Sequence, residues 1–257
     1  MVRGFIRTPS VRLGKGQNVT AFFIVAALLA IVSLKILRTS TAPHYVFPLP
    51  NEVRGVIIDI GLYDDIVQPK EGEFVIAIDA SLREIEKFKL STMCQRLGAC
   101  LLINAAIGQG GKPFVNLQQS KREGGSSHIT NYDPTVWPME LSPAVVPVFT
   151  LQTVIDSIPP QLTINLCKTD TNGNDVYVIE SAGASLQRCR HLVMEIVGPR
   201  DGTGPPDQYE RAIQITQRLG FQFDPNYPSD RQDGGSYNLF FIHASAKGYS
   251  ESHRIPT

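Results

Sequence analysis

The sequence has few of the residues that build metal and redox sites. Its 257 residues include four cysteines and five histidines, and they form no Cys-x-x-Cys pair and no Cys/His spacing that suggests zinc. Because structural zinc needs four such ligands at short spacing, we predict no metal site. The Gly-x-Gly-x-x-Gly fingerprint is also missing, which disfavours a dehydrogenase. The hydrophobic share of 42% and the charged share of 19% are typical of a folded globular protein and exclude a disordered or fibrous chain.

Acidic residues are missing from the first 45 positions, although the whole chain has a formal net charge of zero. That segment holds six basic residues: Arg3, Arg7, Arg12, Lys15, Lys35 and Arg38. The rest of the chain therefore carries 18 basic and 24 acidic residues. Nucleic-acid binding needs clustered Lys and Arg on the domain itself, so we predict no nucleic-acid partner.

An uncharged apolar run covers residues 19–34 and continues past Lys35 to residue 37. A membrane-spanning helix needs about 20 mostly apolar residues, so we predict a signal anchor over 19–37. A buried core helix is the first alternative. A cleaved signal peptide is the second, because Ser40 and Ala42 resemble a cleavage site.

With a membrane anchor, the chain is predicted to divide into four segments. We expect a cytosolic basic tail over 1–18, the transmembrane segment, a Pro-containing stalk over 38–52, and a folded domain over 53–257. The basic flank places the N-terminus in the cytosol, which predicts a single-pass type II protein of the endomembrane system, in the ER or Golgi.

If the domain lies in the lumen, its cysteines are in an oxidising compartment where disulfides form. Cys94 and Cys100 are close enough in sequence to pair, whereas Cys167 falls in an apolar strand pattern where we expect a reduced, buried thiol.

Strand and helix patterns alternate through the body. Short apolar runs predict strands at 55–60, 73–79, 100–107, 162–168, 191–197 and 236–243, with weaker strand patterns at 113–117 and 144–149. Helices are expected at 81–98, 150–157, 172–190 and 206–219. This alternation predicts an α/β fold with a doubly wound, mostly parallel sheet.

Polar residues follow the apolar strands at the edge where such sheets bind ligands. Asp59 and Gly61 close the first strand and Asp79 closes the second. Asn104 lies in the third, and later strands bring Lys168, Asp170 and Glu195. A carboxylate in the position of Asp79 is suited to the two hydroxyls of a ribose.

The order of these motifs resembles the FkbM family of S-adenosylmethionine (SAM)-dependent methyltransferases, over about residues 53–243. The segment 164–175 (INLCKTDTNGND) resembles the family's signature "Lys-x-Asp-x-Glu-Gly-x-Glu": Lys168, Asp170 and Gly173 match, and Asn172 and Asp175 stand where glutamates are usual. The strand with Glu195, residues 148–155 and residues 124–127 also resemble family segments. The resemblance implies a seven-stranded Rossmann-like methyltransferase sheet.

The resemblance also implies roles for single residues. Asp59 and Gly61 would form the cofactor loop, Asp79 would hold the ribose, and Asn104 and Ala105 would lie beside the adenine of SAM. The implied reaction is O-methylation of a sugar, glycan or similar small acceptor. The base that takes the hydroxyl proton would be Asp170, Glu195 or His128, with Asp170 first because it lies in the signature.

The first motif departs from the family pattern. The family has "Asp-x-Gly-Ala-Asn-x-Gly", whereas residues 59–65 read DIGLYDD, and Pro69 shortens any following helix. A catalytically inactive binding or scaffolding protein of the same fold is therefore the alternative function.

Structural roles compete with the catalytic ones. Asp170 and Asp175 are also suited to cap the helix that follows them. Glu195 is equally suited to a rim position paired with Lys168, and His128 to a solvated loop.

Overall fold

The computed structural model describes residues 46–62, 66–90, 99–120, 127–128, 141–197, 206–224 and 237–246. The chain divides into two compact units, and the second, from Val46 onward, contains all the described residues. None of the described helices is long and apolar enough to cross a membrane, and the predicted anchor at 19–37 lies outside the described part of the chain.

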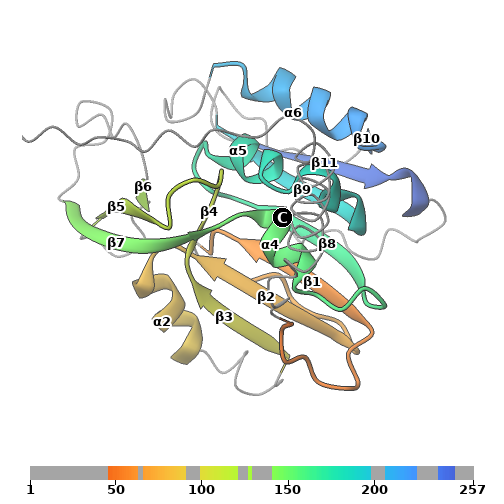
Figure 1. Cartoon of the computed structure of the whole chain (residues 1–257), viewed down its shortest axis with the longest axis horizontal. Coiled ribbons are helices and arrows are strands. Elements are labelled where there is room, and N and C mark those ends of the chain that lie inside the picture. Colours follow the sequence, from red (N-terminus) through yellow and green to blue (C-terminus); the bar gives the residue numbers. More distant parts are fainter. Residues whose placement is uncertain are drawn as a thin grey trace, which may run out of the picture. The chain divides into compact units, whose positions relative to one another are not determined.

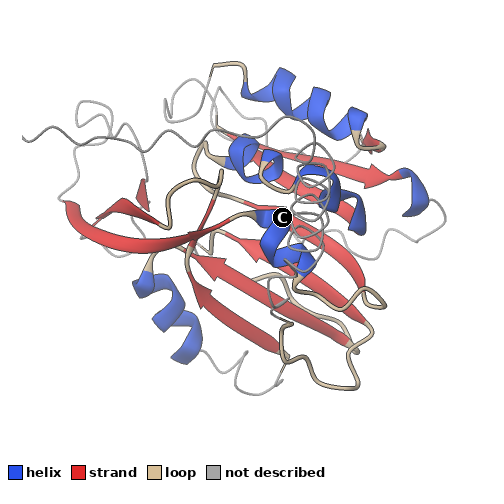
Figure 2. Ribbon diagram, viewed as in Figure 1, coloured by secondary structure: helices blue, strands red, loops and turns tan. Residues whose placement is uncertain are grey.

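A seven-stranded sheet forms the centre of this unit (Figures 1 and 2). Its order is β10 (Phe221–Phe223), β11 (Tyr237–His243), β9 (Cys189–Ile196), β8 (Thr163–Thr169), β1 (Gly55–Ile60), β2 (Glu73–Asp79) and β3 (Cys100–Asn104). The strands from β9 to β3 pair in parallel, and β11 is antiparallel to both of its neighbours. The prediction of a doubly wound, mostly parallel sheet is confirmed, but β10 was not predicted from the sequence.

The central strands are apolar throughout because both faces of the sheet are covered. On β1, Val56, Ile58 and Ile60 belong to the core on one face, and Ile57 belongs to the core on the other. Helices α4 (Leu151–Asp156), α5 (Asp175–Glu180) and α6 (Gln208–Arg218) contribute to the first core. Helix α2 (Leu82–Leu90) contributes to the second and lies beside β3 in Figure 1.

A second sheet stands next to the carboxyl ends of β2 and β3. It has the order β4 (Ala106–Ile107), β7 (Leu141–Phe149), β5 (Phe114–Ser120) and β6 (Ser127–His128). The predicted strand at 100–107 is therefore two strands in two sheets, divided at Ala105, whose N–H donates to the Asp79 carbonyl at 3.0 Å. The weaker patterns at 113–117 and 144–149 are confirmed as parts of β5 and β7.

The single helix predicted over 172–190 is wrong. Residues 175–180 form α5, a 3₁₀ helix η1 covers Gly183–Arg188, and β9 already begins at Cys189. Gly183 has a φ of 51°, in the left-handed region, which ends α-helical continuation between α5 and η1.

Part of the predicted stalk packs against the domain. Phe47 is buried in the main core, and its N–H donates to the Ser157 carbonyl at 3.1 Å. Residues 38–45 of that predicted stalk lie outside the described part of the chain.

Candidate functional site

The strand order reverses its direction between β1 and β8. From β1 the chain builds outward through β2 and β3, and from β8 it builds outward on the other side through β9. In doubly wound sheets, ligands bind outside the carboxyl ends of the strands at this switch point. The ends of β1, β2, β3 and β8 therefore define the candidate site.

Asp59 and Lys168 join the two strands at the switch point. Asp59 is fully buried on β1, and its Oδ1 accepts a hydrogen bond from Lys168 Nζ on β8 at 3.1 Å. Lys168 Nζ also donates to the Gly61 carbonyl at 3.3 Å and lies 3.8 Å from Asp170 Oδ2. The other oxygen of Asp59 accepts from the Val67 N–H at 2.8 Å. One buried ion pair thus contacts the first residue, Gly61, and the middle, Val67, of the chain segment that follows β1.

The attraction between Asp59 and Lys168 offsets the free-energy cost of burying each charge. Burial lowers the pKa of Lys168, but the attraction of Asp59 and Asp170 outweighs it, so the pKa of this ammonium is raised. Burial raises the pKa of Asp59, and Lys168 and the Val67 N–H partly offset that effect. Each partner therefore depends on the other to remain ionised inside the protein.

The backbone of Gly61 packs directly against the residue that follows β8, Asp170. It has a φ of 85°, and a Cβ at this position would overlap the carbonyl of Asp170. The Gly61 N–H donates to the Ile78 carbonyl at 2.9 Å, and the Asp170 N–H donates to the Ile60 carbonyl at 2.8 Å. Gly61 therefore permits the ends of β1 and β8 to lie in direct contact.

Asp79 ends β2 and organises the neighbouring backbone. Its two carboxylate oxygens each accept one amide N–H at 2.6 Å, from Leu62 and from Ser81. Burial raises its pKa to about 6, although these two hydrogen bonds act in the opposite direction. A carboxylate offers about four acceptor positions, and these two hydrogen bonds use two of them.

Asn104 and Ala105 lie beside Asp79, as the paired ends of β2 and β3 require. Asn104 Nδ2 donates to the carbonyls of Asp79 and Ala80, both at 3.0 Å, and Ala105 is buried. The side chain of Asn104 holds the turn after β2 next to the end of β3.

A tight turn follows β8. Asn172 has a φ of 51° and Gly173 a φ of 89°, which are conformations that Asn and Gly tolerate best. Asp175 is fully buried, and both of its oxygens accept from the Thr171 N–H at 3.2 Å. Burial, with a smaller effect from Asp170, raises the pKa of Asp175 to about 6. Asp175 is thus a buried anchor for the turn that carries Asp170.

The three candidate bases lie in different places. Asp170 is at the site, directly after β8, with 32% of its side chain exposed. Glu195 lies on β9, half-buried, paired in register with Asn238 of β11. His128 lies on the two-residue strand β6 of the second sheet, and its side chain is outside the described part of the structure.

The connection from β1 to β2 differs from a standard crossover. Its described residues, 61–62 and 66–72, contain no helix. Leu62 and Ile66 are instead buried against the sheet face that a crossover helix would cover. Residues 63–65, where the sequence departs most from the family motif, lie outside the described residues.

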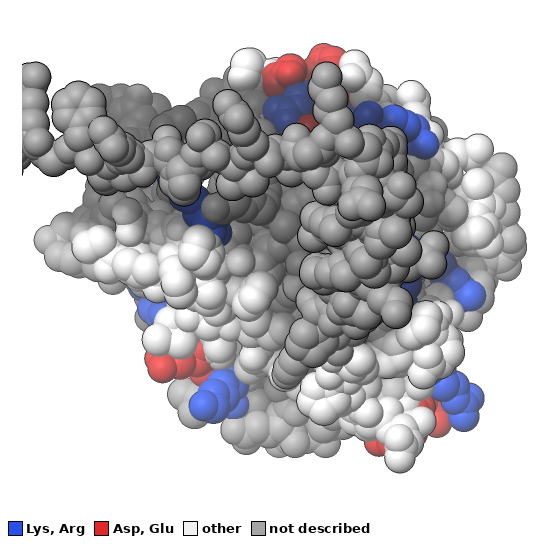
Figure 3. Space-filling model, viewed as in Figure 1, with Lys and Arg blue, Asp and Glu red and all other residues white. Residues whose placement is uncertain are grey.

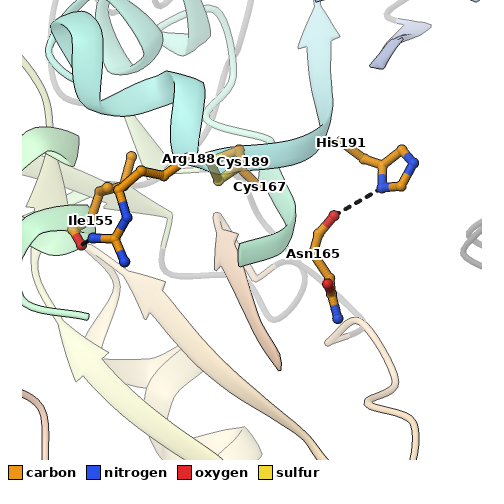
Figure 4. Close-up of a disulfide and its surroundings, with 6 residues drawn as sticks. All are labelled: Ile155, Asn165, Cys167, Arg188, Cys189 and His191. Atoms are coloured by element: carbon orange, nitrogen blue, oxygen red, sulfur yellow. Dashed lines mark hydrogen bonds between the residues drawn. A yellow bond between two sulfur atoms is a disulfide. The ribbon is translucent and has the colours of Figure 1, made fainter. Parts of the chain in front are cut away.

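A disulfide lies one residue before Lys168. Cys167 of β8 is bonded to Cys189 of β9, and both are fully buried (Figure 4). Next to it, Arg188 donates to the Ile155 carbonyl at 2.6 Å, and His191 Nδ1 is 2.9 Å from the Asn165 carbonyl oxygen. The expectation of a reduced thiol at Cys167 is wrong, because Cys167 is bonded to Cys189, the first residue of the neighbouring strand β9.

The predicted pairing of Cys94 with Cys100 is tested at one residue only. Cys100 is also disulfide-bonded, and Cys94 lies outside the described residues.

Sequence reasoning placed Lys168 among the polar residues at the strand ends but gave neither Lys168 nor Asp175 a role in the site. Both stood in the signature, but the partners of Lys168 come from β1, far away in the sequence. Across the described ranges, no group of three or more His, Cys, Asp or Glu side chains is placed to hold a metal ion.

Comparisons with known proteins give a limited result. No family model matches the chain, so the resemblance to the FkbM family stays a prediction. No curated protein matches it either.

Solved structures show a distant likeness. A TehB-like SAM-dependent methyltransferase from Corynebacterium glutamicum has 13% identity and a TM-score of 0.34, covering 76% of this chain and 82% of its own. A putative methyltransferase from Streptococcus mutans, in complex with SAH, has 10% identity and a TM-score of 0.38, covering 74% and 89%. The fibrillarin pre-rRNA processing protein of Methanococcus jannaschii has 11% identity and a TM-score of 0.39, covering 77% and 71%. These scores are too low to carry a functional conclusion, and no comparison shows a family for this chain.

Proposed function

We propose that this chain is a SAM-dependent O-methyltransferase that acts on a hydroxyl of a sugar, glycan or similar small acceptor. The observation that carries the proposal is the position of Asp79. Its carboxylate ends β2 beside the switch point, is held by the N–H groups of Leu62 and Ser81, and keeps acceptor capacity for the two hydroxyls of a ribose.

The described residues include candidate partners for the nucleoside half of SAM. Asp79 would hold the ribose, with Asn104 and Ala105 beside the adenine. SAM supplies an already activated methyl group, so the protein mainly aligns the acceptor and removes its proton. Asp170 is the candidate base because it is partly exposed at the switch point, and Lys168 Nζ lies 3.8 Å from it.

Titration calorimetry on the full chain in detergent, with SAM and S-adenosylhomocysteine (SAH), tests this function. We expect binding by the wild type and a loss of at least about tenfold in Asp79→Asn, because a neutral amide accepts fewer hydrogen bonds. Lys89→Met on α2 is the matched control and should bind as the wild type does. A folded wild-type chain that binds neither compound would contradict the proposal.

A catalytically inactive binding or scaffolding protein is the second candidate. The described part of the β1–β2 connection has no helix whose N-terminus would attract the carboxylate of the cofactor. The space beside Gly61 is filled by the Asp170 carbonyl. Folded protein without cofactor binding would favour this candidate.

The membrane anchor and the organelle belong to the proposal as well. We propose a type II protein with its domain in the lumen of the ER or Golgi. The Cys167–Cys189 bond and the bonded Cys100 support this placement, because disulfides persist in oxidising compartments. Protection of the domain from protease in sealed microsomes would test it, and cleavage without detergent would contradict it.

The proposed partner is a small or glycan acceptor and not a nucleic acid. Residues 46–257 carry 18 basic and 24 acidic residues. On the face shown in Figure 3, the described Lys and Arg residues lie in small separate groups, some of them next to Asp or Glu. This pattern does not favour contact with a phosphate backbone.

A further inference from the structure

The second sheet exposes large apolar side chains on its outer face. On the inner face, Leu117 of β5 and Val146 of β7 are buried in a small core of their own. Successive side chains of a strand point to opposite faces, so Phe114, Val145 and Phe149 point outward. Their exposed fractions are 58%, 69% and 42%. An antiparallel sheet with one buried face usually has polar side chains on the other, so this apolar outer face needs an explanation.

These three side chains are neighbours on the outer face. Phe114 of β5 is paired in register with Pro147 of β7. Val145 and Phe149 stand two positions to either side of Pro147, and such diagonal neighbours are about 7–8 Å apart in a sheet. Figure 1 shows β5 and β7 side by side. Phe114, Val145, Pro147 and Phe149 therefore form one surface, which we call the outer patch.

The chain around the outer patch carries almost no charge. Residues 106–118 and 143–149 contain one charged side chain, Lys112, and no acidic one. Lys112 is exposed and stands two positions before Phe114. Exposed apolar patches mark contacts with proteins or membranes. A lysine beside such a patch suits lipid, because its alkyl stem covers apolar surface while its ammonium group reaches the phosphates of the headgroups.

The predicted membrane anchor limits how far the domain can move from a bilayer. Only residues 38–45 separate the predicted anchor at 19–37 from Val46, the first described residue. Fully extended, this tether spans at most about 28 Å. A folded domain of this size has a radius of gyration of about 17 Å, so the domain stays within about one diameter of the lipid. At this high effective concentration, a weak apolar contact is enough to select the face that meets the bilayer.

We propose that the outer patch is a membrane contact, through which the second sheet lies against the bilayer that holds the anchor. This inference rests on the anchor in the proposed function and is independent of the cofactor site. The Phe and Val side chains enter the boundary between headgroups and acyl chains, and Lys112 lies at the level of the phosphates. The contact gives the domain one fixed orientation on the membrane.

Tryptophan reporters test this contact on the full chain, reconstituted in nanodiscs of phosphatidylcholine. The chain has one tryptophan, Trp137, which is replaced by Phe in every variant. Phe114→Trp places a reporter in the outer patch, and Phe149→Trp places a second one there. Phe223→Trp is the matched control, because Phe223 is a 40% exposed aromatic residue on β10, the edge strand at the opposite end of the main sheet from β3. Lipid brominated on its acyl chains quenches only tryptophans that reach the bilayer.

The reporters in the outer patch should respond to brominated lipid and the control should not. Phe114→Trp should lose about half or more of its fluorescence, because an interfacial apolar side chain lies about 5–10 Å into the bilayer surface. Phe223→Trp should lose less than about a tenth. Val145→Asp, added to the Phe114→Trp reporter, should reduce the quenching by about twofold or more, because a carboxylate is costly to bring into lipid. Since Val145 is exposed, this change should leave the melting temperature unaltered.

The outcomes separate the membrane contact from the anchor. Quenching of both patch reporters, but not of Phe223→Trp, supports the contact. Equal quenching at positions 114 and 223, or none at either, in a chain that stays with the nanodisc would overturn the contact alone, as would quenching that Val145→Asp leaves unchanged. Patch reporters that neither brominated lipid nor aqueous iodide quenches would assign the patch to a second copy of the chain and would also overturn it. A chain that does not stay with the nanodisc would overturn the anchor and this inference together, whereas SAM binding is measured separately.

Discussion

Gly61 and Asp170 lie so close together that the carbonyl of Asp170 occupies the space where a side chain on Gly61 would begin. Gly61 directly follows β1, and Asp170 directly follows the neighbouring strand β8. The contact therefore ties the two chain segments that border the switch point. The Asp170 N–H donates to the Ile60 carbonyl at 2.8 Å, which holds the same two segments from the other side.

Gly61→Ala should destabilise the domain by about 2 kcal/mol or more, because the new Cβ overlaps backbone at a φ of 85°. Gly108→Ala is the matched control, since nothing lies within 4 Å of the place of its Cβ, and it should change stability by less than about 0.5 kcal/mol. Urea unfolding of both variants measures the difference. Equal stability of the two variants would show that the Gly61–Asp170 contact is not close in solution.

Removing the Cys167–Cys189 bond should lower the free energy of unfolding by about 3 kcal/mol, as expected for a bond that closes a loop of this length. The variant Cys167→Ala/Cys189→Ala, compared with the wild type by urea unfolding, measures the loss. Peptide mapping of the unreduced wild-type chain is the companion experiment. Alkylation of both cysteines as free thiols in that map would contradict the assignment.

Asp175 should make stability depend on pH between about 4 and 6. Burial raises its folded pKa to about 6 from an ordinary 3.8, so the folded state binds the proton more tightly than the unfolded state. The resulting stabilisation is fully present below the ordinary pKa and is lost as the pH rises through the folded pKa. The quantity to compare is the free energy of unfolding of the wild type minus that of Asp175→Asn. This difference should fall by up to about 1.4 kcal/mol for each unit that the pH rises in this window.

Urea unfolding of both proteins at several pH values from 4 to 7 measures this difference. Asp79 also has a pKa raised to about 6, and it titrates in both proteins, so its contribution cancels. A constant difference across the window would mean that Asp175 titrates normally in the folded chain.

Much of the fold could be predicted from the sequence because a strand buried on both faces must be apolar along its whole length. Residues 55–60 and 73–79 were predicted as strands with the bounds that the structure has for β1 and β2. The helix predicted over 172–190 was wrong because a left-handed Gly183 stops helical continuation, and its φ is not visible in an apolar pattern. The strand β10 was missed because three residues are too few to show a period.

For the candidate site, the sequence by itself determined which chemical groups stand at the strand ends: Asp59, Asp79, Asn104 and Asp170 each follow or close an apolar run. Only the tertiary structure decided which of them touch. Lys168 meets Asp59, 109 residues away, and Cys167 meets Cys189, because the sheet order places β8 between β1 and β9. The physical reason is that partners across a parallel sheet are chosen by strand order, and no local pattern along the chain records that order.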